Sequence, residues 1–126
     1  MYVVSRSYEY RPDGKRVTIC TVDEEYVGEF ARGVTTAGDT SIVASDGSLI
    51  WPTAIALDSN QNVYVADEWL NRISIFDKDG EWLGKWGTEG SGDGEIDRPS
   101  GLAFDGDDNL YITEELNHRV SKFTKD

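Results

Sequence analysis

One pair of adjacent carboxylates recurs at equivalent places of two similar segments, as Asp67-Glu68 and Glu114-Glu115. Paired carboxylates suit two kinds of chemistry, general acid–base catalysis and the binding of a hard cation. An arginine follows the first acid of each pair by five residues, at Arg72 and Arg119. A catalytic group needs to occur only once, so the duplication favours a structural role. We therefore expect each arginine and first acid to form an ion pair that holds a loop. Each second acid is expected to be solvated or to bind a cation weakly.

Two acidic segments resemble the beginning of a calcium-binding loop, because oxygen-bearing side chains alternate along Asp58–Asn62 and Asp105–Asn109. A calcium loop also needs glycine at its sixth position and a closing glutamate, and neither segment has them. Both segments are therefore predicted to be hairpin turns. The sequence predicts no cofactor, with calcium kept as the alternative.

Histidine occurs once, at His118. A zinc site built on two or three histidines therefore cannot form within a single chain. The neighbours of this histidine recur in part at Asn71-Arg72, so we expect His118 to be a structural residue of a connection. A metal-binding or catalytic role is the minor alternative.

These residues belong to an internal repeat. Residues 52–79 and 99–126 align without a gap at an offset of 47, with 11 of 28 positions identical. Residues 16–31 align with residues 72–87 at an offset of 56. A period of about 40 to 50 residues with several short strands per unit is typical of β-propeller blades. The predicted fold class is all-β, a β-propeller segment of about three four-stranded antiparallel blades.

The repeat predicts ten strands and no helix, with the first and third blades each lacking one strand. A further hairpin is expected at Ser41–Gly47, because the segment before Trp51 is nine residues longer than its counterpart. The expected organisation is a partial first blade at 1–31, an extended linker at 32–51, a second blade at 52–87, a glycine-rich linker at 88–98 and a partial third blade at 99–126. The expected strands are Tyr2–Val4, Arg16–Cys20, Tyr26–Phe30, Ala54–Asp58, Val63–Asp67, Arg72–Phe76, Trp82–Trp86, Gly101–Asp105, Leu110–Thr113 and Arg119–Phe123.

The composition excludes several classes of protein. The chain has 126 residues, 38% of them hydrophobic, without a long apolar run, so we expect a soluble domain with no membrane span. Its formal net charge of −12 repels phosphate backbones and argues against nucleic acid as a partner. The first residues lack a basic region followed by an apolar one, so no signal peptide is predicted. Localisation stays open, because the chain begins inside an expected strand.

The repeated residues resemble the NHL repeat. The segment Asn117-His118-Arg119-Val120 is close to the centre of that signature, and Asn71-Arg72-Ile73 is a shortened match. The stretch 87–99 is similar to the glycine-rich linker between blades of that family. NHL propellers usually have six blades, so the resemblance implies that this chain is half of one. Either a longer chain or a homodimer of two head-to-tail copies would then complete the ring.

The resemblance also bears on enzymatic activity. Some NHL-type propellers are peptidyl-hydroxyglycine lyases, in which histidines that follow the proline of the inner strand bind a central metal. The corresponding residues here are Thr53 and Ser100. The leading hypothesis is a non-enzymatic scaffold that binds a protein or a small ligand on a propeller rim. A fragment of a metal-dependent propeller enzyme, lyase-like or lactonase-like, is the alternative.

The candidate ligand-binding residues are those expected at the rim or near the central channel. Trp51 and Arg98 precede the prolines that open the inner strands, and Trp51 is the tryptophan expected to contact a ligand. No catalytic residue and no metal ligand is predicted. The full set of candidates is Trp51, Thr53, Asp67, Glu68, Arg98, Ser100, Glu114, Glu115 and His118.

Packing expectations follow from the same repeat. Three tryptophans, Trp69, Trp82 and Trp86, are expected to pack between blades. Three blades do not close a ring, so the two end faces are expected to expose apolar side chains. Those expected to be exposed are Val17 and Ile19 at one end and Val120 at the other.

Overall fold

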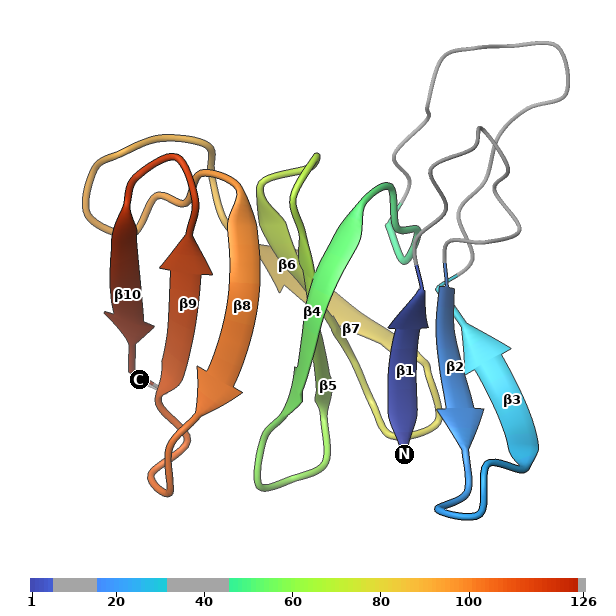
Figure 1. The fold of residues 1–126 in the computed structure, drawn as a ribbon. Helices are drawn as coiled ribbons and strands as arrows, with labels where there is room; N and C mark the ends of the chain where they lie inside the picture. Colours follow the sequence, from blue (N-terminus) through green and yellow to red (C-terminus); the bar gives the residue numbers. More distant parts are fainter. Residues whose placement is uncertain (6–15, 32–45, 125–126) are drawn as a thin grey trace, which may run out of the picture.

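The computed structural model describes residues 1–5, 16–31 and 46–124. These residues form ten strands in three antiparallel sheets, and no helix occurs among them. The sheets follow one another in chain order (Figure 1). They are successive blades of a partial β-propeller, so the predicted all-β fold class is confirmed. We refer to them as blades 1, 2 and 3.

Blade 2 is a four-stranded sheet of order β4-β5-β6-β7, flanked by two three-stranded sheets. Blade 1 has the order β1-β2-β3, and blade 3 has the order β8-β9-β10. The strands are β1 Tyr2–Ser5, β2 Arg16–Cys20, β3 Tyr26–Phe30, β4 Pro52–Leu57, β5 Val63–Asp67, β6 Arg72–Phe76, β7 Trp82–Trp86, β8 Pro99–Phe104, β9 Leu110–Glu114 and β10 Arg119–Phe123.

The strand register repeats from blade to blade. Tyr64 lies opposite Ile75 in blade 2, and their counterparts Tyr111 and Lys122 lie opposite each other in blade 3. Residues directly opposite each other in an antiparallel pair project from the same face of the sheet. Equivalent residues of successive blades therefore face the same way along the propeller.

The two segments that resemble calcium loops are hairpin turns, as predicted. The Asp58 carboxylate accepts hydrogen bonds from the backbone N–H groups two and four residues later, at 2.9 and 2.8 Å. Asp105 does the same in blade 3, at 3.0 and 2.9 Å. The fourth residue of each turn, Gln61 or Asp108, has a left-handed backbone with φ of 65° or 60°. Each leading aspartate thus closes its own turn.

The apolar core forms two layers between the blades, each drawn from neighbouring sheets. Apolar burial between sheets is the main favourable term for such a stack of blades. The layer between blades 1 and 2 is centred on Val17, Leu49, Val63, Val65 and Phe76. The layer between blades 2 and 3 is centred on Ala66, Ile73, Ile96, Leu110 and Ile112.

One of the two end faces agrees with the prediction and the other does not. Val120 of blade 3 is 63% exposed, as predicted. The prediction for Val17 is wrong, because this side chain is fully buried against blade 2. Val17 lies opposite Val4, and both pack into the layer between blades 1 and 2, so this row faces inward.

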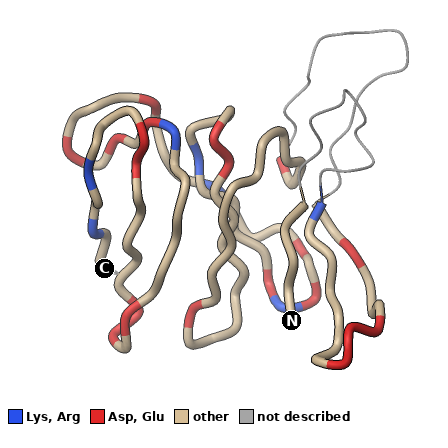
Figure 2. Tube along the Cα trace, in the orientation of Figure 1, with Lys and Arg blue, Asp and Glu red and all other residues tan. Residues whose placement is uncertain are grey.

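Charged residues gather at the ends of the strands. Figure 2 shows the acidic residues mainly in the connections between strands. The hairpin expected at Ser41–Gly47 lies outside the described residues except for Asp46 and Gly47, which form a turn. In the described part of the chain, no helix has the length and apolar character needed to cross a membrane.

Candidate binding site on the upper rim

One end of the blades carries most of the candidate residues. We define the upper rim as residues 46–51, 68–71, 87–98 and 115–118, which connect strands at the upper end of the blades (Figure 1). The connections of blades 2 and 3 are built alike. The N–H of Glu68 donates to the carbonyl of Trp51, and the N–H of Glu115 donates to the carbonyl of Arg98, both at 3.0 Å.

A small hollow opens on this rim between blades 2 and 3. Its volume is about 170 Å³, and its lining residues are Trp51, Glu68, Trp69 and Arg98. We refer to it as the rim pocket. The Trp69 side chain is 67% exposed, whereas Trp51 is half-buried. The structure therefore brings together three predicted candidates and one tryptophan that was expected to pack between blades.

The expectation for Trp69 is wrong, and the reason is its position. Trp69 lies in the connection between β5 and β6, where the alternation of inward and outward residues along a strand does not apply. Its counterpart in the next repeat, Leu116, is also exposed, at 51%. The sequence did contain a signal for this position. Both repeats have a large apolar residue there, outside any strand.

Backbone geometry holds Arg98 at the edge of the rim pocket. Its backbone is left-handed, with φ of 48°. Its N–H donates to the Oδ1 of Asn71 at 2.8 Å, which joins the linker before β8 to the β5–β6 connection. The pocket therefore lies across two blades that are fixed to each other at this point.

Both charges of the rim pocket are accessible to a ligand. The Nη1 of Arg98 lies 3.7 Å from the Oε1 of Glu68, and the two side chains are 50% and 20% exposed. A partly exposed ion pair with this separation contributes only about 0–1 kcal/mol. A carboxylate of a ligand can therefore approach the half-exposed Arg98 with little loss from this ion pair.

Asp67, a further candidate, is buried and holds the chain that leads into β4. Its carboxylate accepts hydrogen bonds from three backbone N–H groups, those of Ile50 at 2.7 Å, Trp51 at 3.2 Å and Leu70 at 3.1 Å. These bonds occupy the carboxylate, so Asp67 positions Trp51 and does not itself reach a ligand.

Glu114 holds the equivalent position in blade 3 and is also buried. It accepts hydrogen bonds from the N–H of Asp97 at 3.2 Å, the Nδ2 of Asn117 at 2.5 Å, the Nε of Arg119 at 3.0 Å and the hydroxyl of Ser121. Burial acts to raise the pKa of this carboxyl. The hydrogen bonds outweigh burial, and the pKa of Glu114 lies below its ordinary value.

The two repeated arginines secure the loops that precede the inner strands. Arg119 donates to three carbonyls of the loop 91–95, at 2.9 to 3.1 Å, and forms the predicted ion pair with Glu114 at 3.0 Å. Arg72, opposite Asp67 at the end of the β5–β6 pair, donates to the carbonyl of Ser48 at 2.9 Å. Both arginines therefore hold a loop, as predicted, and the predicted ion pair with the first acid is seen in blade 3.

The two hydroxyl candidates lie on the inner strands and bond within the sheets. The Oγ1 of Thr53 donates to the carbonyl of Pro99 at 2.7 Å and so links β4 to β8. The hydroxyl of Ser100 lies 3.1 Å from the Oγ1 of Thr113 on β9. Neither residue lines the rim pocket.

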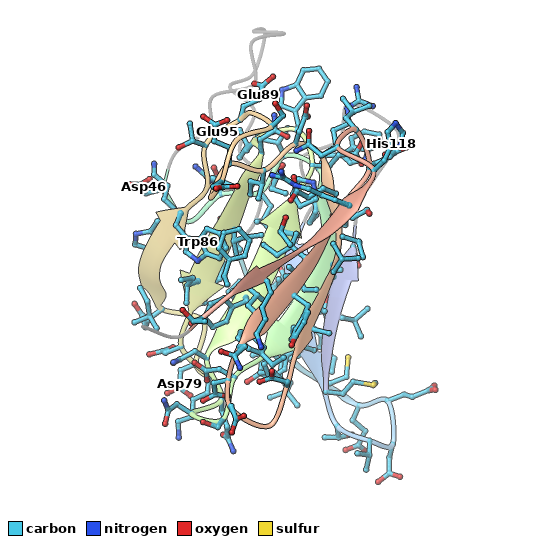
Figure 3. All side chains as sticks on the ribbon, turned by 90° about the vertical axis from the view of Figure 1, so that its left-hand side faces the viewer. Asp46, Asp79, Trp86, Glu89, Glu95 and His118 are labelled. Atoms are coloured by element: carbon cyan, nitrogen blue, oxygen red, sulfur yellow. The ribbon has the colours of Figure 1, made fainter. Side chains whose placement is uncertain are left out.

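The last two candidates, Glu115 and His118, are exposed on the β9–β10 connection. His118 has a left-handed backbone with φ of 50°, and its N–H points to the carbonyl of Glu115 at 3.4 Å. Figure 3 shows His118 at the same end of the blades as Glu89 and Glu95, with Asp79 at the opposite end. Across residues 1–5, 16–31 and 46–124, no three His, Cys, Asp or Glu side chains are grouped so as to hold a metal ion.

Comparison with known proteins identifies the repeat. Residues 97–123 match the NHL repeat. A stretch of 36 residues is 56% identical to part of NHL repeat-containing protein 3 of Homo sapiens, and covers 28% of this chain and 10% of that protein. The virginiamycin B lyase of Staphylococcus aureus, solved in its selenomethionine form, is similar over 90% of this chain and 35% of that chain, at 16% identity and a TM-score of 0.48. The chain thus spans only a small part of both proteins, and the predicted resemblance to the NHL repeat is confirmed.

Proposed function

We propose that this NHL-repeat segment of a β-propeller is a non-enzymatic scaffold that binds a peptide segment of a partner protein in the rim pocket. The observation that carries the proposal is the exposure of Trp69. A tryptophan that is 67% exposed, beside a second tryptophan and an accessible arginine, has the composition of a binding hot spot. An exposed apolar patch that is rimmed by polar residues commonly marks an interaction site.

The size of the rim pocket favours a peptide over a metabolite. Its volume of about 170 Å³ is below the range of about 300–1,000 Å³ that is typical of small-molecule sites. It has room for one large side chain. The two tryptophans suit an apolar or aromatic side chain, and Glu68 and Arg98 suit a charged neighbour of either sign.

The hydroxyls of Thr53 and Ser100 support the non-enzymatic part of the proposal. By the resemblance to the NHL repeat, they lie at the positions where peptidyl-hydroxyglycine lyases of that type carry metal-binding histidines. Both hydroxyls are in hydrogen-bond contact within or between the sheets. Their geometry thus serves the packing of the inner strands.

Selection from a random-peptide phage library on the immobilised chain tests the proposal. We expect enriched peptides to share an apolar or aromatic residue next to a charged one. Trp69→Ala should weaken their binding at least about tenfold, because it removes the aromatic wall of the pocket. Leu83→Ala, a change of another exposed apolar residue on the outer strand, is the matched control and should leave binding unchanged. Peptides that bind Trp69→Ala as tightly as the unmodified chain would contradict the proposal.

We further propose that these three blades form half of a six-bladed ring, completed by a second copy. The exposed Val120 on the end face of blade 3 supports this arrangement, since a neighbouring blade would cover it. Light scattering should then give a mass of about 28 kDa, twice the 14.0 kDa of one chain. A stable, monodisperse species of 14.0 kDa would contradict it.

A further inference from the structure

Strand β6 carries a buried hydroxyl that has no hydrogen-bond partner among the described residues. The Ser74 side chain is 0% exposed, and its Oγ finds no donor or acceptor within residues 1–5, 16–31 and 46–124. Burial removes the water that such a hydroxyl binds in the unfolded chain, and the loss is offset only where a new partner replaces it. Native proteins therefore satisfy nearly all of their buried polar groups, with protein atoms or with ordered water.

The counterpart of Ser74 in blade 3 does have a partner. Ser121 lies 47 residues later, and its hydroxyl donates to the Oε1 of Glu114. The residue at the position of Glu114 in blade 2 is Asp67. Each acid lies diagonally across the strand pair from its serine, and diagonal neighbours share one face of a sheet. Ser74 therefore faces the same side of blade 2 as the Asp67 carboxylate.

One oxygen of each acid has the same role in both blades. The Oδ2 of Asp67 accepts a hydrogen bond from the N–H of Ile50 at 2.7 Å. The Oε2 of Glu114 accepts one from the N–H of Asp97, which lies one repeat after Ile50, at 3.2 Å. Both carboxylates are thus attached to equivalent points of the loop that precedes an inner strand.

The other oxygen has a different role in the two blades, because aspartate is one methylene shorter than glutamate. The Oδ1 of Asp67 accepts hydrogen bonds from the backbone N–H groups of Trp51 at 3.2 Å and Leu70 at 3.1 Å. In blade 3 the longer side chain carries the corresponding oxygen to the serine hydroxyl. The missing C–C bond, about 1.5 Å in length, leaves Ser74 beyond the direct reach of the acid.

We propose that a buried water molecule joins the Ser74 hydroxyl to the Asp67 carboxylate. It takes the space that the extra methylene and the extended carboxylate oxygen occupy in blade 3, accepts from Ser74 and donates to Asp67. A carboxylate has about four acceptor sites. Glu114 accepts four hydrogen bonds from described residues and Asp67 three, so one site is left for the water.

The water has the surroundings that a buried water requires. Such a molecule needs two to four polar partners and a polar site shielded from the solvent. The serine and the aspartate provide an oxygen on either side, and both side chains are 0% exposed. Arg72, opposite Asp67 in the strand pair, brings a further donor to the same face. A bridge of this kind is nearly as favourable as a direct hydrogen bond.

The water supports the backbone beneath the rim pocket. The carboxylate that it contacts holds the N–H groups of Trp51 and of Leu70, which directly follows Trp69. It therefore helps to fix both connections that carry the tryptophans of the pocket. The inference concerns this support alone and is independent of what the pocket binds.

The sign of a change in stability tests the proposal. Ser74→Ala removes one partner of the water, so the midpoint of thermal unfolding should fall by about 2–5 °C. A hydroxyl that is buried without any partner would give the opposite sign, because its removal ends an uncompensated loss of hydration. A midpoint that is unchanged or raised in Ser74→Ala would overturn the proposal.

Crystal structures of the unmodified chain and of Asp67→Glu provide a second, independent readout. The unmodified chain should show one ordered water within about 3.2 Å of both the Ser74 Oγ and the Asp67 carboxylate. Asp67→Glu gives blade 2 the acid of blade 3, and its carboxylate should displace the water and accept directly from Ser74. No water between the two groups in the unmodified chain, or a water that persists in Asp67→Glu, would contradict the assignment.

Discussion

The two inter-blade layers of this protein are held in the same way at one end and differently at the other. At the upper rim a buried acid and an arginine hold the loop that enters each inner strand, Asp67 with Arg72 in blade 2 and Glu114 with Arg119 in blade 3. At the opposite end, Trp82 and its turn close the first layer, whereas the second layer borders a cavity of about 300 Å³ beside Tyr64, Trp86 and Phe123. Loop attachment is thus shared by blades 2 and 3, while closure of the aromatic end of the first layer depends on the outer strand β7.

The largest expected effect is on core packing in the two layers. Phe76→Ala should lower the free energy of unfolding by about 3–5 kcal/mol, because it removes a fully buried ring from a closed layer. Phe123→Ala should cost about 1–2 kcal/mol, because this ring is partly exposed and already borders a cavity. Urea unfolding of both variants measures the difference. Equal losses would mean that the two layers are equally closed.

The second-largest loss of stability is expected when the Asp67 carboxylate, a buried acceptor of loop hydrogen bonds, is removed. Asp67→Ala leaves three backbone N–H groups without their acceptor and should cost about 3 kcal/mol. Asp67→Asn, which keeps one acceptor oxygen in place, is the matched control and should cost clearly less. Thermal unfolding of the two Asp67 variants measures the difference in stability. A loss in Asp67→Ala below that of Asp67→Asn would contradict the role assigned to this carboxylate.

Substitutions of two turn glycines test how tightly the first layer is closed, and their effects on the free energy of unfolding should be smaller. Gly80→Ala should cost about 2 kcal/mol, since φ is +88° and the new methyl group would meet the Phe30 ring at 2.6 Å. Gly106→Ala should change stability by less than about 0.5 kcal/mol, because its Cβ would meet no atom within 4 Å. The repeat carries Ser59 at the position of Gly106, which agrees with a tolerant site. A neutral Gly80→Ala would show that the turn does not press on blade 1.

The smallest expected effect is a dependence on pH. The side chain of Asn109, followed by its backbone N–H, lowers the pKa of Asp105 to about 2 from an ordinary value of 3.8. Because the folded-state pKa is the lower one, the stabilisation is complete above about pH 4 and is lost as the pH falls towards 2. Asn109→Ala should therefore flatten the decrease of the urea midpoint between these pH values. An unchanged decrease would show that this turn does not contribute.

Much of the fold could be predicted because the sequence repeats. The same alternation of apolar residues occurs in both repeats and so indicated each strand twice. The offset of 47 residues between the repeats showed which positions are equivalent. The face of a strand that meets the next blade cannot be read from alternation alone, and this is why Val17 was wrongly expected to be exposed.

The candidate site was predictable in part for a related reason. Trp51 and Arg98 were identified by their places before the inner-strand prolines, and Glu68 by its recurrence in both repeats. Their meeting in one pocket depends on how the rim connections of two blades approach each other, which no local pattern encodes. Trp69 was missed because a connection has no periodicity from which to infer exposure.

Hydrogen exchange of the chain alone tests most directly the claim that β6 is paired on both sides, whereas β10 is paired, within residues 46–124, only with β9. Amides of residues 72–76 should all be protected, since β6 is paired on both sides. In residues 119–123, the alternate amides that point away from β9 should exchange at least about 100-fold faster than their counterparts in β6. Protection of those amides to the level of β6 would contradict the account.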